Sequence, residues 1–187
     1  MVKIGFIVEG ATEKIILEKS DLFPLLRENN IEFVAEIIND EGNGNLLPHN
    51  INPYSRALVD KGATKIFILT DLDEEQCITK TKNRIGSSAH RIVCVSIKTI
   101  EAWYLADQEA MRTFLGFATF DCAAPQEIID PFQFIKTLRL QHSSRGVADK
   151  KILANLMIKS GFTIKKAAGH PLCLSAHYFL KRILETV

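Results

Sequence analysis

The chain has 187 residues, of which 47% are hydrophobic and 24% charged, and these values exclude a disordered chain and favour a globular one. A formal net charge of +1 excludes a strong overall field toward nucleic acid, so any such contact must come from local patches. No apolar run approaches the ~20 residues of a transmembrane helix, and no signal-peptide cleavage site follows the N-terminus. We therefore expect a cytoplasmic protein without membrane contact.

In chain order, the first half of the sequence alternates between strand patterns and helix patterns. Apolar, β-branched segments predict four strands, at residues 3–8, 31–38, 65–70 and 91–97. Amphipathic segments between them predict helices at residues 11–26, 51–61 and 74–88, the first of them kinked or ended at Pro24. Residues 39–45 are polar and rich in glycine and predict a loop. This alternation predicts an α/β fold with a mostly parallel four-stranded sheet flanked by helices.

The second half of the chain is mainly helical. Helices are predicted at residues 99–106, 108–115, 131–140, 149–160 and 172–185. No linker separates the two halves, so we expect one domain over residues 1–187. In this domain residues 1–107 form the α/β core that carries the functional site, and residues 108–187 form a helical extension packed on it.

Acidic residues directly follow two of the predicted strands. Glu9 comes after the first strand, and Asp71 and Asp73 come after the third. The carboxyl ends of parallel strands line the crevice in which open α/β sheets bind ligands, so these side chains should converge there. Such a cluster is costly unless a cation neutralises it, and Mg²⁺ prefers carboxylate oxygens, with Mn²⁺ as an alternative ion.

Each acidic residue admits more than one role. Asp71 and Asp73 are two positions apart, so on an extended segment they face the same way and could share one ion. The alternative is a turn rich in aspartate that caps the next helix. Glu9 could hold the same ion, hold a second ion or act as a general base. Glu101 follows the fourth strand and would add to the cluster, while Lys98 could neutralise a phosphate or an oxyanion.

Four further charged residues are candidates for substrate binding: Glu13, Lys80, Lys82 and Arg84. The alternative for Glu13 is a first-turn acid stabilised by the helix dipole. For the three basic residues the alternative is a solvated helix face. Trp103 follows Glu101 on a predicted helix, where a place in the core is favoured over a surface that stacks nucleic-acid bases.

Two segments together resemble a known domain. "FIVEGATEKIIL" (residues 6–17) with "IFILTDLD" (residues 66–73) is similar to the Toprim domain of topoisomerases, primases and overcoming-lysogenization-defect nucleases. The VEGxTE form resembles more closely a family of small bacterial Toprim-like proteins. "SIKTIEAWYLAD" (residues 96–107) and, more loosely, "CLSAHYFLKRIL" (residues 173–184) extend this similarity to roughly a quarter of the chain.

The resemblance implies a Rossmann-like Toprim fold and gives roles to the acidic residues. Glu9 would be the general acid/base or a metal ligand, and Asp71 and Asp73 would be the metal-binding pair. The further acidic and basic residues that complete two-metal catalysis in the best-known Toprim nucleases have no obvious counterpart here.

The expected function is a Mg²⁺-dependent nuclease that hydrolyses phosphodiester bonds of DNA or RNA. The resemblance implies an effector of anti-phage defence or of a toxin-like system. A second hypothesis is a catalytically silent module that binds nucleic acid or a partner protein and regulates an associated ATPase. A third is hydrolysis of a small phosphorylated substrate in the same crevice. The apolar C-terminal helix could form a homodimer face or belong to the core.

Overall fold

The structure is a computed structural model that describes all residues except 41–45, 87, 144 and 187. Most of the loop predicted at residues 39–45 therefore lies outside the described residues. The strands are β1 (Val2–Val8), β2 (Ile31–Phe33), β3 (Ile38–Asn39), β4 (Lys65–Asp71) and β5 (Arg91–Ser96). The helices are α1 (Ala11–Lys19), α2 (Leu22–Glu28), α3 (Pro48–Asp60), α4 (Ile78–Ile85), α5 (Glu101–Ala106), α6 (Gln108–Leu115), α7 (Pro131–His142), α8 (Lys150–Lys159), α9 (Ile164–Gly169) and α10 (Leu174–Leu184).

The described strands form an open, parallel sheet, as the sequence predicted, but it has five strands and not four. The order is β2-β1-β4-β5, and β3 also pairs with β1. The second predicted strand is divided: Ile31 lies opposite Val2, whereas Ile38 lies opposite Ile7. This segment thus carries two more residues than β1 over the same span, and the extra residues must bulge out of the ladder between β2 and β3.

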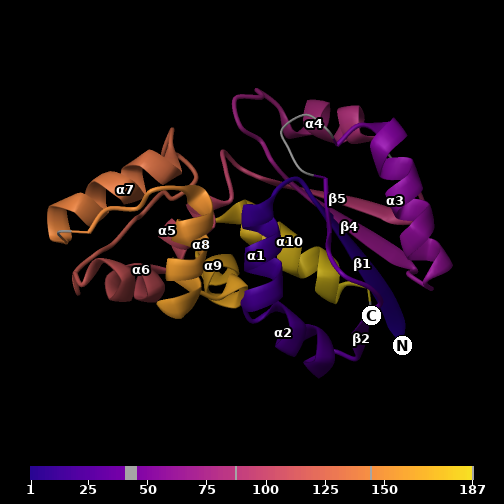
Figure 1. Cartoon of the computed structure of the whole chain (residues 1–187), viewed down its shortest axis with the longest axis horizontal. Coiled ribbons are helices and arrows are strands. Elements are labelled where there is room, and N and C mark those ends of the chain that lie inside the picture. Colours follow the sequence, from indigo (N-terminus) through magenta and orange to yellow (C-terminus); the bar gives the residue numbers. More distant parts are fainter. Residues whose placement is uncertain (41–45, 87, 144, 187) are drawn as a thin grey trace.

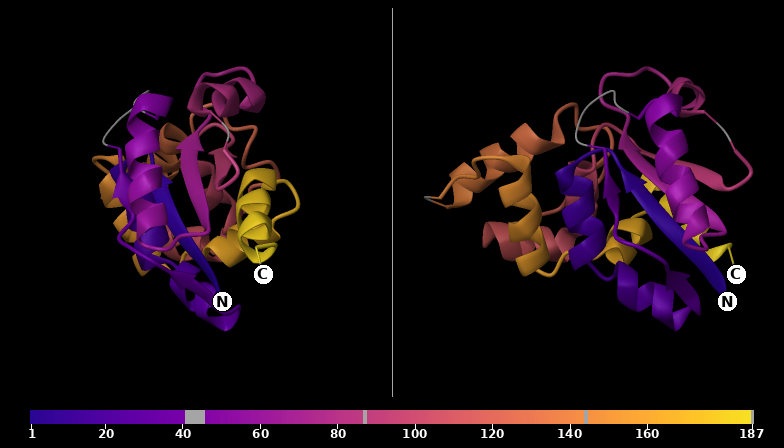
Figure 2. Two further views of the ribbon diagram at one scale, coloured as in Figure 1. Left: turned by 90° about the vertical axis from the view of Figure 1, so that its right-hand side faces the viewer. Right: turned by 45° about the vertical axis from the view of Figure 1, so that its right-hand side comes forward.

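Helices cover both faces of the sheet, which explains why β1 and β4 are apolar along nearly their whole length. Ile7, Ile66 and Ile68 pack against α3 and α4, and the alternate residues Phe6 and Phe67 pack against the helices of the opposite face. Figure 2 shows α3 and α10 on opposite sides of the sheet.

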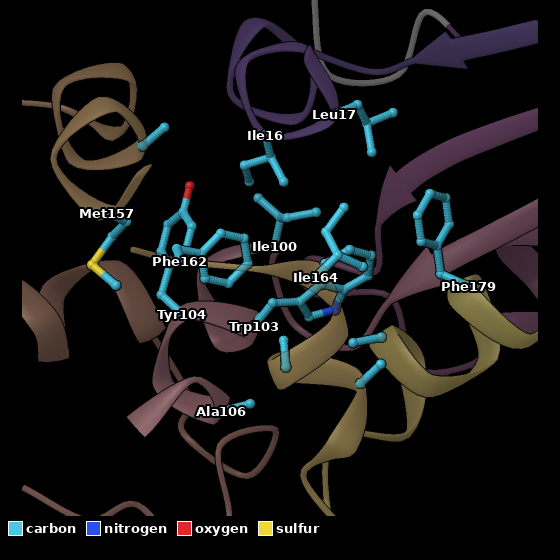
Figure 3. Close-up of a cluster of buried hydrophobic side chains, with 14 of the residues drawn as sticks. Ile16, Leu17, Ile100, Trp103, Tyr104, Ala106, Met157, Phe162, Ile164 and Phe179 are labelled. Atoms are coloured by element: carbon cyan, nitrogen blue, oxygen red, sulfur yellow. The ribbon is translucent and has the colours of Figure 1, made fainter. Parts of the chain in front are cut away.

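The remaining helices gather beside the sheet rather than over its centre. Figure 1 shows α5 to α9 next to α1, with α7 farthest from the strands, and both termini at the other end of the molecule. Trp103 and Tyr104 of α5 are fully buried here, together with Phe162 and Phe179 (Figure 3). The Trp103 indole N–H donates to Ser175 Oγ at 2.8 Å, so its predicted place in the core is confirmed.

Several helices differ from those predicted: α3 begins at Pro48 and not at residue 51, and α9 lies in a segment for which no helix was predicted. The first helix is interrupted at Ser20 and Asp21, and Pro24 lies in the first turn of α2, where a missing N–H costs little. The helix expected at residues 74–88 is shorter, because α4 begins only at Ile78. Within the described residues, no helix is long and apolar enough to cross a membrane.

Candidate functional site

The acidic residues that follow β1 and β4 lie side by side. Glu9 Oε2 accepts a hydrogen bond from the backbone N–H of Asp71 at 3.1 Å, and a second from the Thr70 hydroxyl. Because β1 and β4 are neighbours in the parallel sheet, their carboxyl ends bring these residues together, as the sequence predicted. Burial raises the pKa of Glu9, and its two hydrogen bonds partly offset that rise.

The Asp71 carboxylate connects three elements of the fold. Its Oδ1 accepts from the Ser96 hydroxyl at the end of β5 and from the backbone N–H of Ile100, at 2.8 Å, where α5 begins. Burial raises the pKa of Asp71 well above its usual value, and the nearby charges of Glu13 and Glu101 add to the rise. Asp71 therefore orders the start of α5 and adds a buried carboxyl group to the site.

Asp73 does not continue the strand, which corrects the expectation that Asp71 and Asp73 share an extended segment. Its φ is 50°, in the left-handed region that aspartate tolerates better than most residues. Its N–H donates to the carbonyl of Lys98 at 2.8 Å, and Lys98 is itself left-handed with a φ of 63°. Nor does Asp73 cap α4, whose N-cap is Cys77.

Two backbones in a sparsely populated conformation thus meet at the carboxyl edge of the sheet. Such residues cost of order 1 kcal/mol each and tend to cluster at functional sites. Burial raises the pKa of Asp73, and the charges of Lys150 and Arg84 lower it in part.

Glu13 and Glu101 extend the cluster into the protein. Glu13 is 5% exposed, and burial, with the charges of Glu101 and Glu9, raises its pKa to about 7. Glu101 is fully buried, and neither of its carboxylate oxygens has a hydrogen-bond partner among the described residues. This is unusual, because buried charges are normally paired and hydrogen-bonded.

Gly10 provides space for the Glu13 carboxylate. A Cβ atom at this position would lie 3.0 Å from Glu13 Oε2. The backbone of Gly10 is extended, with a φ of −147°, so the glycine is not needed for a tight turn. What limits a larger residue at Gly10 is thus side-chain space beside Glu13 and not backbone conformation.

Lys150, which the sequence interpretation missed, brings a positive charge to this cluster. It begins α8, and its Nζ lies 3.4 Å from Glu101 Oε2. Burial would lower the pKa of Lys150, but the charges of Glu101, Asp71 and Asp73 raise it overall. No sequence signal identifies Lys150, since α8 reaches the site only by packing along α1 (Figure 1).

Three hydroxyl groups at the site were also missed. Thr70 and Ser96 occupy strand ends, and a hydroxyl residue beside a candidate carboxylate is the signal that could have identified them. The Tyr104 hydroxyl is buried without a hydrogen-bond partner among the described residues, and in Figure 3 it points toward the side on which α1 and α8 lie. Burial and the charges of Glu101, Glu13 and Asp71 raise the pKa of Tyr104.

The three basic residues of α4 that were predicted to bind substrate, Lys80, Lys82 and Arg84, lie in different surroundings. Arg84 is close enough for its charge to lower the pKa values of Glu9 and Asp73 in part. The Lys82 ammonium instead lies 3.4 Å from the Tyr178 hydroxyl and 4.6 Å from the centre of the Tyr178 ring, on α10. Lys80 is exposed. Of these three basic residues, Arg84 is the one whose charge affects the pKa values of the acidic cluster.

A pocket of about 610 Å³ adjoins the cluster. Asp73 and Lys98 line it on the sheet side, and Lys150 with residues 129–132 lines it on the helical side. Within the described ranges, no three or more His, Cys, Asp or Glu residues are grouped so that together they could hold a metal ion.

Comparisons of the chain with protein-family models, with curated proteins and with solved structures gave no match. The chain is therefore identified by its architecture, an open α/β fold with a parallel sheet flanked by helices and with buried carboxylates at the carboxyl edge of that sheet.

Proposed function

We propose that this chain is a Mg²⁺-dependent nuclease that hydrolyses phosphodiester bonds of DNA or RNA. The observation that carries the proposal is the hydrogen bond between the Glu9 carboxylate and the backbone of Asp71, at 3.1 Å. It joins acidic residues from two parallel strands at the edge where open α/β sheets bind ligands. We further propose that the fold is Toprim-like, with residues 1–107 as its core and residues 108–187 as a helical extension.

The donor set suits a hard cation. Glu9, Asp71 and Asp73 would hold Mg²⁺ or Mn²⁺ through one or two carboxylates, with water and substrate phosphate as the other ligands. When bound, the ion would polarise a phosphate oxygen and lower the pKa of a bound water. Glu101 supports the fit, because its fully buried carboxylate has no hydrogen-bond partner among the described residues and is accompanied by one half-exposed cation, Lys150, at 3.4 Å.

The chain's own residues would position the substrate and move protons. The raised pKa of Glu9 brings this carboxyl closer to neutrality, which suits a general acid or base. Lys98 and Lys150 line the adjoining pocket and would stabilise negative charge on the phosphate. Glu101 would hold Lys150 in place through their ion pair at 3.4 Å.

The site's place in biology follows from the resemblance to small bacterial Toprim-like proteins. We propose a cytoplasmic effector of anti-phage defence or of a toxin-like system.

A second candidate function is favoured by one observation: in the described part of the chain, the acidic residues provide no group of three or more ligands for an ion. A catalytically silent module would need no such group. It would bind nucleic acid or a partner protein and regulate an associated ATPase.

Cleavage assays distinguish the two functions. Plasmid, single-stranded DNA and tRNA are incubated with the protein in Mg²⁺, Mn²⁺ or EDTA. Glu9→Gln and Asp71→Asn should each lower metal-dependent cleavage by about 100-fold or more, since a general acid or base typically contributes that much. The matched controls Glu28→Gln and Asp60→Asn change exposed carboxylates elsewhere and should cleave as the wild type does. Binding without any product at any metal would instead identify the silent module.

A further inference from the structure

The pocket beside the acidic cluster is lined by two chemically different sets of side chains. One set is charged or polar and consists of Asp73, Glu74, Lys98, Thr99, Asp130 and Lys150. The other set is apolar and consists of Ile129, Pro131 and Phe132, around the start of α7. Apolar side chains and cationic groups in one pocket suit a ligand that is flat and apolar at one end and anionic at the other.

Ile129 is the most exposed of the large hydrophobic residues described, at 85%. Nothing in the fold requires an isoleucine there, because Ile129 belongs to neither hydrophobic core cluster. Phe132 packs against the main hydrophobic core but is only partly buried, and it also lines the pocket. The helical part of the chain therefore presents apolar surface at the mouth of the acidic site.

The cations in this pocket differ in their availability. Lys150 is held by Glu101, whereas Lys98 has no ion-pair partner in the part of the chain that the structure describes. The pocket also contains Asp130, but this carboxylate caps α7 by accepting from the N–H of Gln133 at 3.0 Å. Lys98 is therefore available to a phosphate group.

We infer that this pocket binds one unpaired nucleotide of a DNA or RNA strand, with the base against Ile129 and Phe132 and the phosphate at Lys98. The inference rests on the proposed nuclease function and adds its substrate class: single-stranded or unpaired nucleic acid rather than intact duplex. A volume of about 610 Å³ is typical of a site for one small organic ligand, so a base must leave a duplex to enter it.

The test measures binding of a short fluorescent oligonucleotide with phosphorothioate linkages that resist cleavage, in Mg²⁺, as a single strand and as a blunt duplex. Ile129→Ser and Phe132→Ala should each weaken single-strand binding about tenfold, as expected when a base loses its stacking surface. Phe132→Leu keeps most of the apolar volume but removes the aromatic face, so it should also weaken single-strand binding and replaces the alanine variant if that variant folds poorly. Leu172→Ser, at a site that is 50% exposed, is the matched control and should bind as the wild type does.

The possible outcomes distinguish a failure of the nucleotide-binding inference from a failure of the nuclease proposal. Equal single-strand binding by the wild type, Ile129→Ser and Phe132→Leu overturns the inference, as does tighter binding of the duplex or no binding of the single strand. If binding depends on Ile129 and Phe132 but no metal supports cleavage, the pocket stands and the nuclease proposal fails. If Glu9→Gln abolishes cleavage but the Ile129 and Phe132 variants bind the single strand as the wild type does, the nuclease proposal is supported and this inference fails.

Discussion

Glu9 and Asp71 are buried carboxylates whose oxygens receive hydrogen bonds from backbone N–H groups and hydroxyls, whereas Glu101 is buried more deeply and receives none from the described residues. Glu13 is also buried, and burial with the charges of Glu101 and Glu9 raises its pKa to about 7. The first half of the acidic cluster, Glu9 and Asp71, and the second half, Glu13 and Glu101, are therefore stabilised in different ways.

The difference indicates where an external positive charge would contribute most. Burial raises the pKa values of Glu9 and Asp71, and the hydrogen bonds that these carboxylates accept offset this rise in part. Around Glu13 and Glu101 the protein supplies one partly exposed cation, Lys150, and leaves negative charge uncompensated. A divalent cation should therefore supply to Glu101 the compensation that hydrogen-bond donors supply in part to Glu9 and Asp71.

The largest expected effect is a fall in stability with rising pH. The folded-state pKa of Glu13 is raised from 4.5 to about 7, so the native state holds its proton more tightly than the unfolded state does. This contribution to stability is complete below about pH 4.5 and is lost as the pH rises to about 7, by up to about 3 kcal/mol. Urea unfolding across this pH range measures it.

The Glu13→Gln variant and added Mg²⁺ test whether the pH dependence of stability comes from Glu13 and its neighbours. Glu13→Gln cannot ionise, so its stability should vary less between about pH 5 and about pH 8. Added Mg²⁺ should raise the melting temperature of the wild type at about pH 8 but not at about pH 5, where protons occupy the cluster. A wild-type stability that increases over this range would contradict the assigned burial of Glu13.

The hydrogen-bonded half of the cluster should be tested at Asp71. Asp71→Ala leaves the Ser96 hydroxyl and the Ile100 N–H without their acceptor and should destabilise the fold by about 2 kcal/mol. Asp71→Asn keeps an acceptor oxygen and should cost less than half as much, although it removes the charge. Equal losses in the two variants, measured by denaturant unfolding, would show that these hydrogen bonds do not stabilise the site.

A smaller effect is expected at the ion pair of the second half. Lys150→Met leaves Glu101 buried without its cation and should cost about 1 kcal/mol, less than for a fully buried pair because Lys150 is 44% exposed. Adding Glu101→Met should recover that loss, since the orphaned charge is then gone. A double variant less stable than Lys150→Met alone would show that Glu101 is stabilised by something other than Lys150.

The smallest effect is expected at Gly10. Gly10→Ala places a methyl group 3.0 Å from Glu13 Oε2, but this carboxylate is the flexible end of a side chain and can move. The variant should lose less than about 1 kcal/mol, because the extended backbone accepts alanine. The informative measurement is the pH profile of stability, which should shift if the Glu13 carboxylate is displaced.

The sequence by itself determined the parallel α/β layout and the meeting of Glu9 with Asp71. Continuous apolar segments indicate strands that are buried on both faces of the sheet. Acidic residues that directly follow such strands lie at the same edge of a parallel sheet. Both predictions depend on the regular geometry of strands in a parallel sheet, so the pattern of residues within each segment was sufficient to make them.

Only the tertiary structure decided the rest of the site. Lys150 reaches Glu101 because α8 packs along α1, and the lack of donors around Glu101 depends on how α5 is enclosed. The left-handed turn at Asp73 and Lys98, and the bulge that separates β2 from β3, arise from pairing between strands. Such contacts join residues far apart in sequence, and no local pattern of residues encodes which groups will lie beside a buried charge.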